Sequence, residues 1–171
     1  MVEELRRQHV THVVALPDNA SAALLTLLER EGRPRVVWVT REGEAFAMAS
    51  GLWAGGATPV VLIQNTGLLE SGDALRGTAM RMRIPLVCLV TYRGYASLRG
   101  AGEPAPPVDG ALLGRPDVDS VAALTEPTLR AWAVPYEFLH EDTDIPRLRA
   151  TFARAAALEQ PVALLLPGAT T

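Results

Sequence analysis

Short, strongly apolar runs alternate along this chain with longer stretches whose apolar residues recur at helical spacing. Six runs have the length of strands and mostly lack the alternation expected of a strand with one wet face: residues 12–16, 35–39, 58–64, 85–91, 136–139 and 161–166. Such strands are typical of a parallel sheet covered on both faces. The pattern therefore predicts an α/β fold with a single open, mainly parallel, six-stranded sheet and helices on both faces.

Crossover helices are predicted between these strands, at residues 20–31, 43–54, 72–83 and 145–158. Residues 93–119 break the rhythm, because four of the 13 prolines lie between Pro104 and Pro116 and no helical period is sustained there. Long segments of this kind are usually functional or mobile, so we expect a long Pro/Gly-rich loop. With no second-domain boundary in the sequence, we expect residues 1–171 to form a single domain.

Composition excludes several function classes. All 16 cationic residues are arginines, so mechanisms that need a lysine amine, such as Schiff-base chemistry, are excluded. The net charge of −3 argues against sequence-independent binding to nucleic acid or binding to an anionic membrane. No apolar run is long enough for a membrane span and the first residues lack the apolar core of a signal peptide, so we expect a cytoplasmic protein.

Metal and thiol chemistry are also disfavoured. The single cysteine, Cys88, lies inside an apolar run and is predicted to be a buried small hydrophobe. His9, His12 and His140 are scattered, and none has the spacing of a helical zinc pair. We therefore expect this chain by itself to hold no metal ion.

Polar segments follow four of the predicted strands. In an open parallel sheet, ligands bind outside the carboxyl ends of the strands, where these segments meet. They are Pro17-Asp18-Asn19, Arg41-Glu42-Gly43-Glu44, Gln64-Asn65-Thr66-Gly67 and Tyr92-Arg93-Gly94. Each segment taken singly is also explained by turns and helix caps, a role for which Asn19 and Thr66 are well suited.

In this order, the segments resemble the pyrimidine-binding domain of thiamine-diphosphate-dependent decarboxylases. Within that family the resemblance is to the α subunit of sulfopyruvate decarboxylase and the matching part of phosphonopyruvate decarboxylase. Its strongest stretch is VTREGEAFAMASGLWAGGATPVVLIQNTGL, in which Gly51 follows Glu42 by nine positions. The stretches PLVCLVTYRG, LRAWAVPYEFL and EQPVALLLP resemble later parts of the same domain. The resemblance implies thiamine diphosphate as cofactor and a 2-oxo acid as substrate.

The resemblance places the family's glutamate at Glu42. A protonated carboxyl group there would hydrogen-bond N1′ of the aminopyrimidine and promote loss of the proton from the thiazolium C2. By the same resemblance, cofactor contacts are expected from Asn65, Thr66 and Gly67. Glu44, two residues on, leaves the helix in another direction, and the spacing to Gly51 favours Glu42 over it.

Substrate contacts are expected from three residues by the same resemblance: Asn19, Asn65 and Arg93. Asn19 and Asn65 occupy places where related decarboxylases carry polar residues that face the substrate. The Arg93 guanidinium is suited to bind a sulfonate or phosphonate in a bidentate way. A surface ion pair is the alternative interpretation of Arg93.

Two departures from the family pattern shape these expectations. The diphosphate-binding signature, Gly-Asp-Gly with a later Asn, is absent, and Val108-Asp109-Gly110 lacks its first glycine. The chain thus resembles half of an enzyme, and Mg²⁺ and the diphosphate are expected on a β subunit. Where the family typically continues Gly-Leu-Gly-Asn, this chain has Gly67-Leu68-Leu69-Glu70. We expect a reshaped loop there, with Glu70 and the nearby Asp73 adding carboxylates that disfavour a polyanionic substrate.

These observations predict the α-type subunit of a two-chain thiamine-diphosphate-dependent decarboxylase, with 3-sulfopyruvate or 3-phosphonopyruvate as substrate. Self-association within a hetero-oligomer is expected as well. Two alternatives stay open. One is a carboligase subunit of the acetolactate-synthase type, which product analysis would distinguish. The other is a non-catalytic α/β module for assembly or regulation, which the altered Leu69-Glu70 segment favours and Glu42 disfavours.

Overall fold

All six predicted strands are present in the computed structural model, which describes residues 1–99 and 107–168. They form one sheet in the order β2-β1-β3-β4-β6-β5, and every neighbouring pair is parallel. The strands are β1 (His12–Ala15), β2 (Arg35–Trp38), β3 (Pro59–Gln64), β4 (Val87–Thr91), β5 (Tyr136–Phe138) and β6 (Val162–Leu166). The predicted α/β fold is confirmed.

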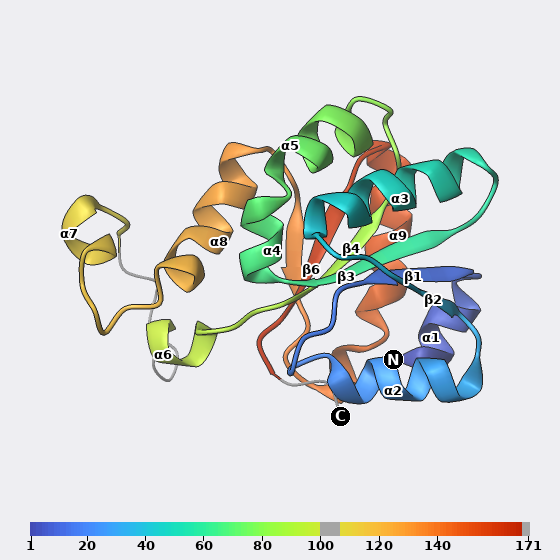
Figure 1. The fold of residues 1–171 in the computed structure, drawn as a ribbon, viewed down its shortest axis with the longest axis horizontal. Helices are drawn as coiled ribbons and strands as arrows, with labels where there is room; N and C mark the ends of the chain where they lie inside the picture. Colours follow the sequence, from blue (N-terminus) through green and yellow to red (C-terminus); the bar gives the residue numbers. More distant parts are fainter. Residues whose placement is uncertain (100–106, 169–171) are drawn as a thin grey trace.

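Helices cover both faces of this sheet, and each face has its own buried core (Figure 1). Successive residues of a strand point to opposite faces, so Val13 packs in one core and Val14 in the other. One face is covered by α1 (Val2–Arg7), α2 (Ala22–Glu31) and α9 (Arg147–Leu158). The other is covered chiefly by α3 (Glu42–Ala54), α4 (Asn65–Glu70), the π-helix η1 (Leu75–Met80) and α8 (Ser120–Ala131). Because both faces are covered, the inner strands β1, β3, β4 and β6 are largely apolar and buried. The edge strands β2 and β5 are less buried and contain Arg35 and Glu137.

Several helices differ from the prediction. Helices α1, α4 and α8 were not predicted, since α1 and α4 are only six residues long and α8 contains Pro127. A proline inside a helix removes one hydrogen bond, and it usually indicates a helix boundary in a sequence. The single helix predicted over residues 72–83 is instead a short α5 (Gly72–Ala74) followed by η1.

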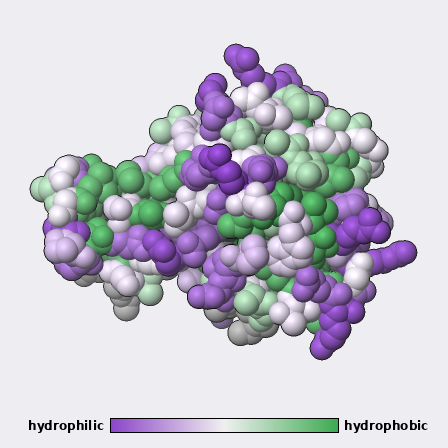
Figure 2. Space-filling model, viewed as in Figure 1, coloured by the Kyte–Doolittle hydropathy of each residue, from purple (hydrophilic) through white to green (hydrophobic). Residues whose placement is uncertain are grey.

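The segment predicted as a loop, residues 93–119, carries two short helices, α6 (Tyr95–Arg99) and α7 (Gly110–Leu113). Residues 100–106 of that segment lie outside the described residues, as do 169–171. Asp109 caps α7 by accepting a hydrogen bond from the Leu112 amide at 2.8 Å. Helix α7 stands away from the sheet at the left of Figure 1, where Figure 2 shows hydrophobic residues beside hydrophilic ones.

One short connection completes the order of elements. The 3₁₀-helix η2 (Asp142–Asp144) joins β5 to α9. Cys88 is buried within β4, as predicted. Within residues 1–99 and 107–168, no helix has the length and apolar character that a membrane crossing requires.

Candidate functional site

Glu42 is the first residue of α3, just beyond the end of β2. Its half-buried side chain lies against Gly67, in the first turn of α4. A Cβ atom at position 67 would lie 2.1 Å from Cγ of Glu42 and 2.5 Å from both Cδ and Oε1. Only glycine leaves room for this approach. Among the described residues, the Glu42 carboxylate forms no hydrogen bond or ion pair, so its oxygens are available to a ligand.

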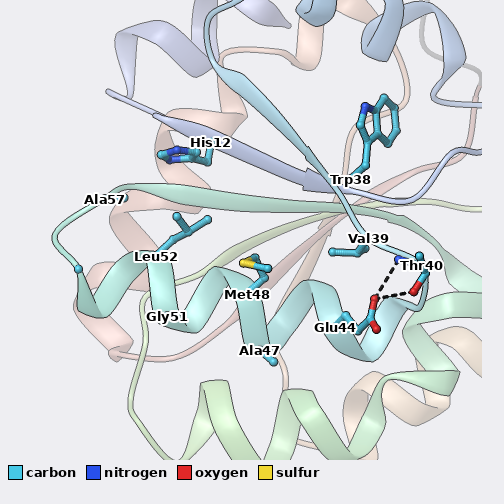
Figure 3. Close-up of a pocket in the computed structure, with 11 residues that line it drawn as sticks. His12, Trp38, Val39, Thr40, Glu44, Ala47, Met48, Gly51, Leu52 and Ala57 are labelled. Atoms are coloured by element: carbon cyan, nitrogen blue, oxygen red, sulfur yellow. Dashed lines mark hydrogen bonds between the residues drawn. The ribbon is translucent and has the colours of Figure 1, made fainter.

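Glu44 has a different role, although it is only two residues away. Its Oε2 accepts hydrogen bonds from the Thr40 amide and the Thr40 hydroxyl, both at 2.9 Å (Figure 3). It also accepts one from the Arg41 amide at 3.2 Å. These bonds, that from the Thr40 amide first, lower the pKa of the Glu44 carboxyl below its ordinary value. Glu44 therefore stabilises the start of α3 as a helix cap, whereas the Glu42 carboxylate forms no hydrogen bond among the described residues.

Glu70 is the residue at which the sequence departs from the family pattern, and it is not a free charge. Its Oε1 accepts a hydrogen bond from Nη2 of Arg41 at 2.6 Å, and its Oε2 accepts one from the Gly43 amide at 3.0 Å. The neighbouring acid Asp73 is paired with Arg76 at 2.7 Å. Each of these two acids is thus paired with an arginine. The expectation that they disfavour a polyanionic substrate stays a prediction. The expected loop is wrong, since residues 65–70 form α4.

Asn65 is fully buried at the start of α4 and joins two strand ends. Its Nδ2 donates to the Arg93 carbonyl at 3.0 Å and to Oγ1 of Thr125 at 3.2 Å. Its Oδ1 accepts from the Arg93 amide at 3.2 Å. The side chain thus prolongs the β3–β4 pairing by one step and connects it to α8. In this arrangement the Asn65 amide positions the main chain of Arg93.

Arg93 has an exposed side chain that is oriented by Asp119. Its Nε donates to Oδ2 of Asp119 at 3.1 Å, while Oδ1 of Asp119 caps α8 by accepting from the Val121 amide at 3.1 Å. Gly94, next in the chain, has a φ of 79° and approaches Asp119 so closely that an added Cβ would lie 2.9 Å from Oδ2. Both nitrogens Nη1 and Nη2 of Arg93 are without hydrogen bonds in the described part of the chain. The ion pair that was the alternative interpretation is present, and within residues 1–99 and 107–168 it engages only the Nε of the guanidinium.

Asp18 occupies the middle of this edge of the sheet, a role that the sequence analysis missed. Its Oδ2 accepts from Oγ1 of Thr91 at 2.7 Å, and its Oδ1 accepts from Nε2 of Gln64 at 3.2 Å and from the Ala20 amide at 2.9 Å. One carboxylate thereby connects the carboxyl ends of β1, β3 and β4. The signal that could have found it is a polar residue at or shortly after the carboxyl end of each of three strands, namely Asp18, Gln64 and Thr91.

The remaining predicted residues lie at the surface of the same edge. Asn19 is exposed at the tip of the turn that the Asp18 carboxylate closes. Thr66 is exposed at the start of α4, and its hydroxyl donates to Oε1 of Gln64 at 3.0 Å. Every predicted site residue therefore follows the carboxyl end of a strand, and direct contact is seen for Glu42 with Gly67 and for Asn65 with Arg93.

A separate apolar groove of about 940 Å³ lies between α3 and β2 (Figure 3). Its walls include Trp38, Met48 and Leu52, and Glu44 stands at its rim. The groove is on the Glu44 side of α3 and does not include Glu42. Within residues 1–99 and 107–168, no cluster of three or more His, Cys, Asp or Glu residues could hold a metal ion.

Solved structures superpose on nearly the whole of this chain. Benzoylformate decarboxylase from Polynucleobacter necessarius superposes with a TM-score of 0.59 at 23% identity, over 96% of this chain and 28% of that one. A putative thiamin diphosphate-dependent enzyme from Mycobacterium smegmatis gives a TM-score of 0.61 at 21% identity, over 96% and 29% of the two chains. At these identities the likeness establishes the fold.

Sequence relatives are decarboxylases of small substituted 2-oxo acids. Phosphonopyruvate decarboxylase of Streptomyces viridochromogenes is 35% identical over 85 residues, which cover 50% of this chain and 21% of that protein. Subunit alpha of the sulfopyruvate decarboxylase of Methanocaldococcus jannaschii is 27% identical over 90 residues, 53% of each chain. Subunit alpha from Methanothermobacter thermautotrophicus is 31% identical over 85 residues, 50% of this chain and 52% of that one. The chain thus matches from about a fifth to about half of these relatives' lengths.

A family model matches a longer part of the chain, which includes most of the residues described above. It is the model described as thiamine pyrophosphate enzyme, N-terminal TPP binding domain, and it matches residues 1–112. That span contains Glu42 and its seat on Gly67, together with Asp18, Asn65 and Arg93. Sequence and fold agree, and the chain belongs to the family of the N-terminal, TPP-binding domain of thiamine pyrophosphate enzymes.

Proposed function

We propose that this chain is the α-type subunit of a two-chain, cytoplasmic, thiamine-diphosphate-dependent decarboxylase that acts on 3-sulfopyruvate or 3-phosphonopyruvate. The observation that carries the proposal is the half-buried carboxylate of Glu42, which lies against Gly67 and is not hydrogen-bonded among the described residues. The names of the sequence relatives support the reaction and the substrate class.

The residues present fit the aminopyrimidine end of the cofactor. Glu42 offers a carboxyl group for a hydrogen bond to N1′. Gly67 has no side chain, so the main chain of α4 can approach that carboxyl group closely. Thr66 and Asn65 begin the same helix and belong to the same cofactor-binding edge. When bound, thiamine diphosphate supplies the electron sink that decarboxylation of a 2-oxo acid requires. The part of Glu42 is to hold a proton at N1′ and so to assist removal of the C2 proton.

The substrate would bind at the exposed residues beyond β1 and β4. Arg93 presents Nη1 and Nη2 to the sulfonate or phosphonate, because Asp119 engages only its Nε. A guanidinium edge of this kind suits a tetrahedral anion. Asn65 holds the Arg93 main chain and could contact the substrate only by exchanging one of its present bonds. Asn19 provides an exposed amide on the neighbouring turn.

A β subunit would complete the site with the diphosphate and Mg²⁺ contacts, and copies of this chain would associate within the resulting hetero-oligomer. Relatives named as subunit alpha support a partner chain. The test is calorimetric titration of thiamine diphosphate and Mg²⁺ into this chain alone and into a complex with a chain that carries the Gly-Asp-Gly signature. We expect weak binding to the single chain, and tight binding with CO₂ release from the complex. Tight binding to the single chain would refute the divided site, and a carboligation product would refute simple decarboxylation.

A further inference from the structure

The first turn of α3 is held by α4 at two successive levels. Gly67 lies beneath the side chain of Glu42. One turn further along α4, Glu70 binds the two residues that flank Glu42, accepting from Nη2 of Arg41 at 2.6 Å and from the Gly43 amide at 3.0 Å. Glu42 is thus the middle residue of a three-residue segment whose two ends are tied to one carboxylate.

Arg41 is the cation next to Glu42 in the chain, and its side chain is 73% exposed. The hydrogen bond to Glu70 raises the pKa of Arg41, and the same bond lowers the pKa of Glu70. Both groups are therefore ionised and paired with each other. A guanidinium released from Glu70 would have the Glu42 carboxylate within its reach, and charge-assisted pairing would draw that carboxylate away from Gly67.

Other charged groups near this turn are already engaged. Glu44, on α3, accepts its three hydrogen bonds from Thr40 and from the Arg41 amide. Asp73, on α5, is paired with Arg76. Glu70 is accordingly the one acid on the neighbouring helices, within the described residues, that binds the Arg41 side chain.

We propose that Glu70 is a positioning residue for Glu42: by holding the Arg41 guanidinium and the Gly43 amide, it keeps the Glu42 carboxyl on Gly67 and free of an internal ion pair. The proposal rests on the assignment of Glu42 in the proposed function. It gives the departure from the family pattern at position 70 a role within the same site. Glu70 would touch neither cofactor nor substrate.

The test is a nuclear Overhauser cross-peak between Hγ of Glu42 and Hα of Gly67, measured on the isotope-labelled full chain without cofactor. Wild type should show the cross-peak, Glu70→Ala should lose it, and Glu70→Gln, which keeps the size of the side chain, should weaken it. The matched control is Asp73→Ala, which removes another acid paired to an arginine on the next helix and should keep the cross-peak. The double variant Arg41→Ala/Glu70→Ala should restore it, because no guanidinium is left to capture Glu42.

Two results would overturn the proposal. Retention of the cross-peak in both Glu70 variants would show that Glu42 stays against Gly67 without any help from Glu70. Failure of the double variant to restore it would make Glu70 an ordinary cap of α3. Should Glu70→Ala fail to fold, Glu70→Gln gives the same decision.

Failure of this inference is distinguishable from failure of the proposed function. The cross-peak depends only on where the Glu42 side chain lies, whereas the chemical role of Glu42 is tested by Glu42→Gln in the two-chain complex. In that complex, Glu70→Ala should lower kcat with little change in KM, and the double variant should recover kcat. An active Glu42→Gln complex would refute the proposed function and leave the result on the cross-peak standing.

Discussion

Glu42 and Gly67 are in such close contact that the α-carbon of one residue forms the seat for the carboxyl group of the other. A methyl group added at position 67 would lie 2.1 Å from Cγ of Glu42, well inside any van der Waals contact. The contact joins the helix after β2 to the helix after β3. It thereby sets the direction in which the Glu42 carboxyl points.

Gly67→Ala should therefore displace the Glu42 side chain. A misplacement of about 1 Å can cost about 100-fold in rate, and we expect a loss of that size in decarboxylation by the two-chain complex. Gly51→Ala is the matched control, because it also lies in a helix and nothing is within 4 Å of the Cβ it would add. It should stabilise the chain by roughly 0.5–1 kcal/mol and leave activity unchanged. Equal activities of the two variants would contradict the proposal that Gly67 positions the Glu42 side chain.

Glu42→Gln should slow the proton transfer while the fold persists. Positioned acid–base groups contribute about 10²–10⁴-fold, so exchange of the thiazolium C2 proton in the complex should slow by that factor. Nuclear magnetic resonance after rapid mixing with D₂O measures the exchange. Glu44→Gln is the control, and we expect it to lower the thermal midpoint and to leave exchange largely unchanged, since Glu44 caps α3. A slow Glu44 variant beside a normal Glu42 variant would reverse the assignment.

Arg93→Ala should impair the use of anionic substrates selectively. A charge-assisted hydrogen bond contributes about 1.5–3 kcal/mol, so kcat/KM for sulfopyruvate or phosphonopyruvate should fall by roughly 10- to 100-fold. Pyruvate, which lacks the substituent, should be affected much less. Arg115→Ala, which removes a surface arginine paired with Asp117, serves as the control and should change none of the three values. Equal losses on all three substrates in Arg93→Ala would show that Arg93 does not bind the substituent.

Acid should loosen the first turn of α3 before the rest of the helix. The pKa of Glu44 is lowered by hydrogen bonds, first that from the Thr40 amide, and the pKa of Glu70 is lowered first by its bond to Arg41. A carboxyl group whose pKa is lower in the folded chain stabilises the fold at pH values above its ordinary pKa of 4.5. This stabilisation is lost as the pH falls through the pKa of the folded state. At pH values below about 4.5, the Gly43 amide should therefore become less protected against hydrogen exchange. The Gly55 amide, which donates to the Gly51 carbonyl, should keep its protection.

Cys88 should be inert in the native chain. It is 1% exposed in β4, and burial raises the pKa of its thiol far above the ordinary range. Iodoacetamide at pH 8 should therefore label it only through unfolding, whereas the chain in urea should react at the rate of a free thiol. Mass spectrometry over time measures both rates. Rapid labelling without urea would mean that β4 opens locally.

Local pattern was sufficient for the sheet, since the six strands are largely apolar and stand out from the helical stretches between them. It was insufficient for α4, because the polar start of that helix, from Asn65, reads equally well as a turn. It was insufficient for α8 as well, since Pro127 indicates a boundary and the helix nevertheless continues to Ala131. Packing of Ala122 and Leu129 into the core overrides that preference.

What the sequence by itself determined is the α/β class, the six strands and the set of polar residues that follow their carboxyl ends. Only the tertiary structure decided the role of each residue. Glu42 lies against Gly67 and has no hydrogen bond among the described residues, whereas Glu44 and Glu70 bind the start of α3. Asn65 is buried and hydrogen-bonds the Arg93 main chain. The physical reason is the range of the interactions. Burial patterns recur every two to four residues, so they can be recognised within a short stretch of sequence. The partner of a carboxylate such as Glu70, in contrast, lies 29 positions away and depends on how two helices pack.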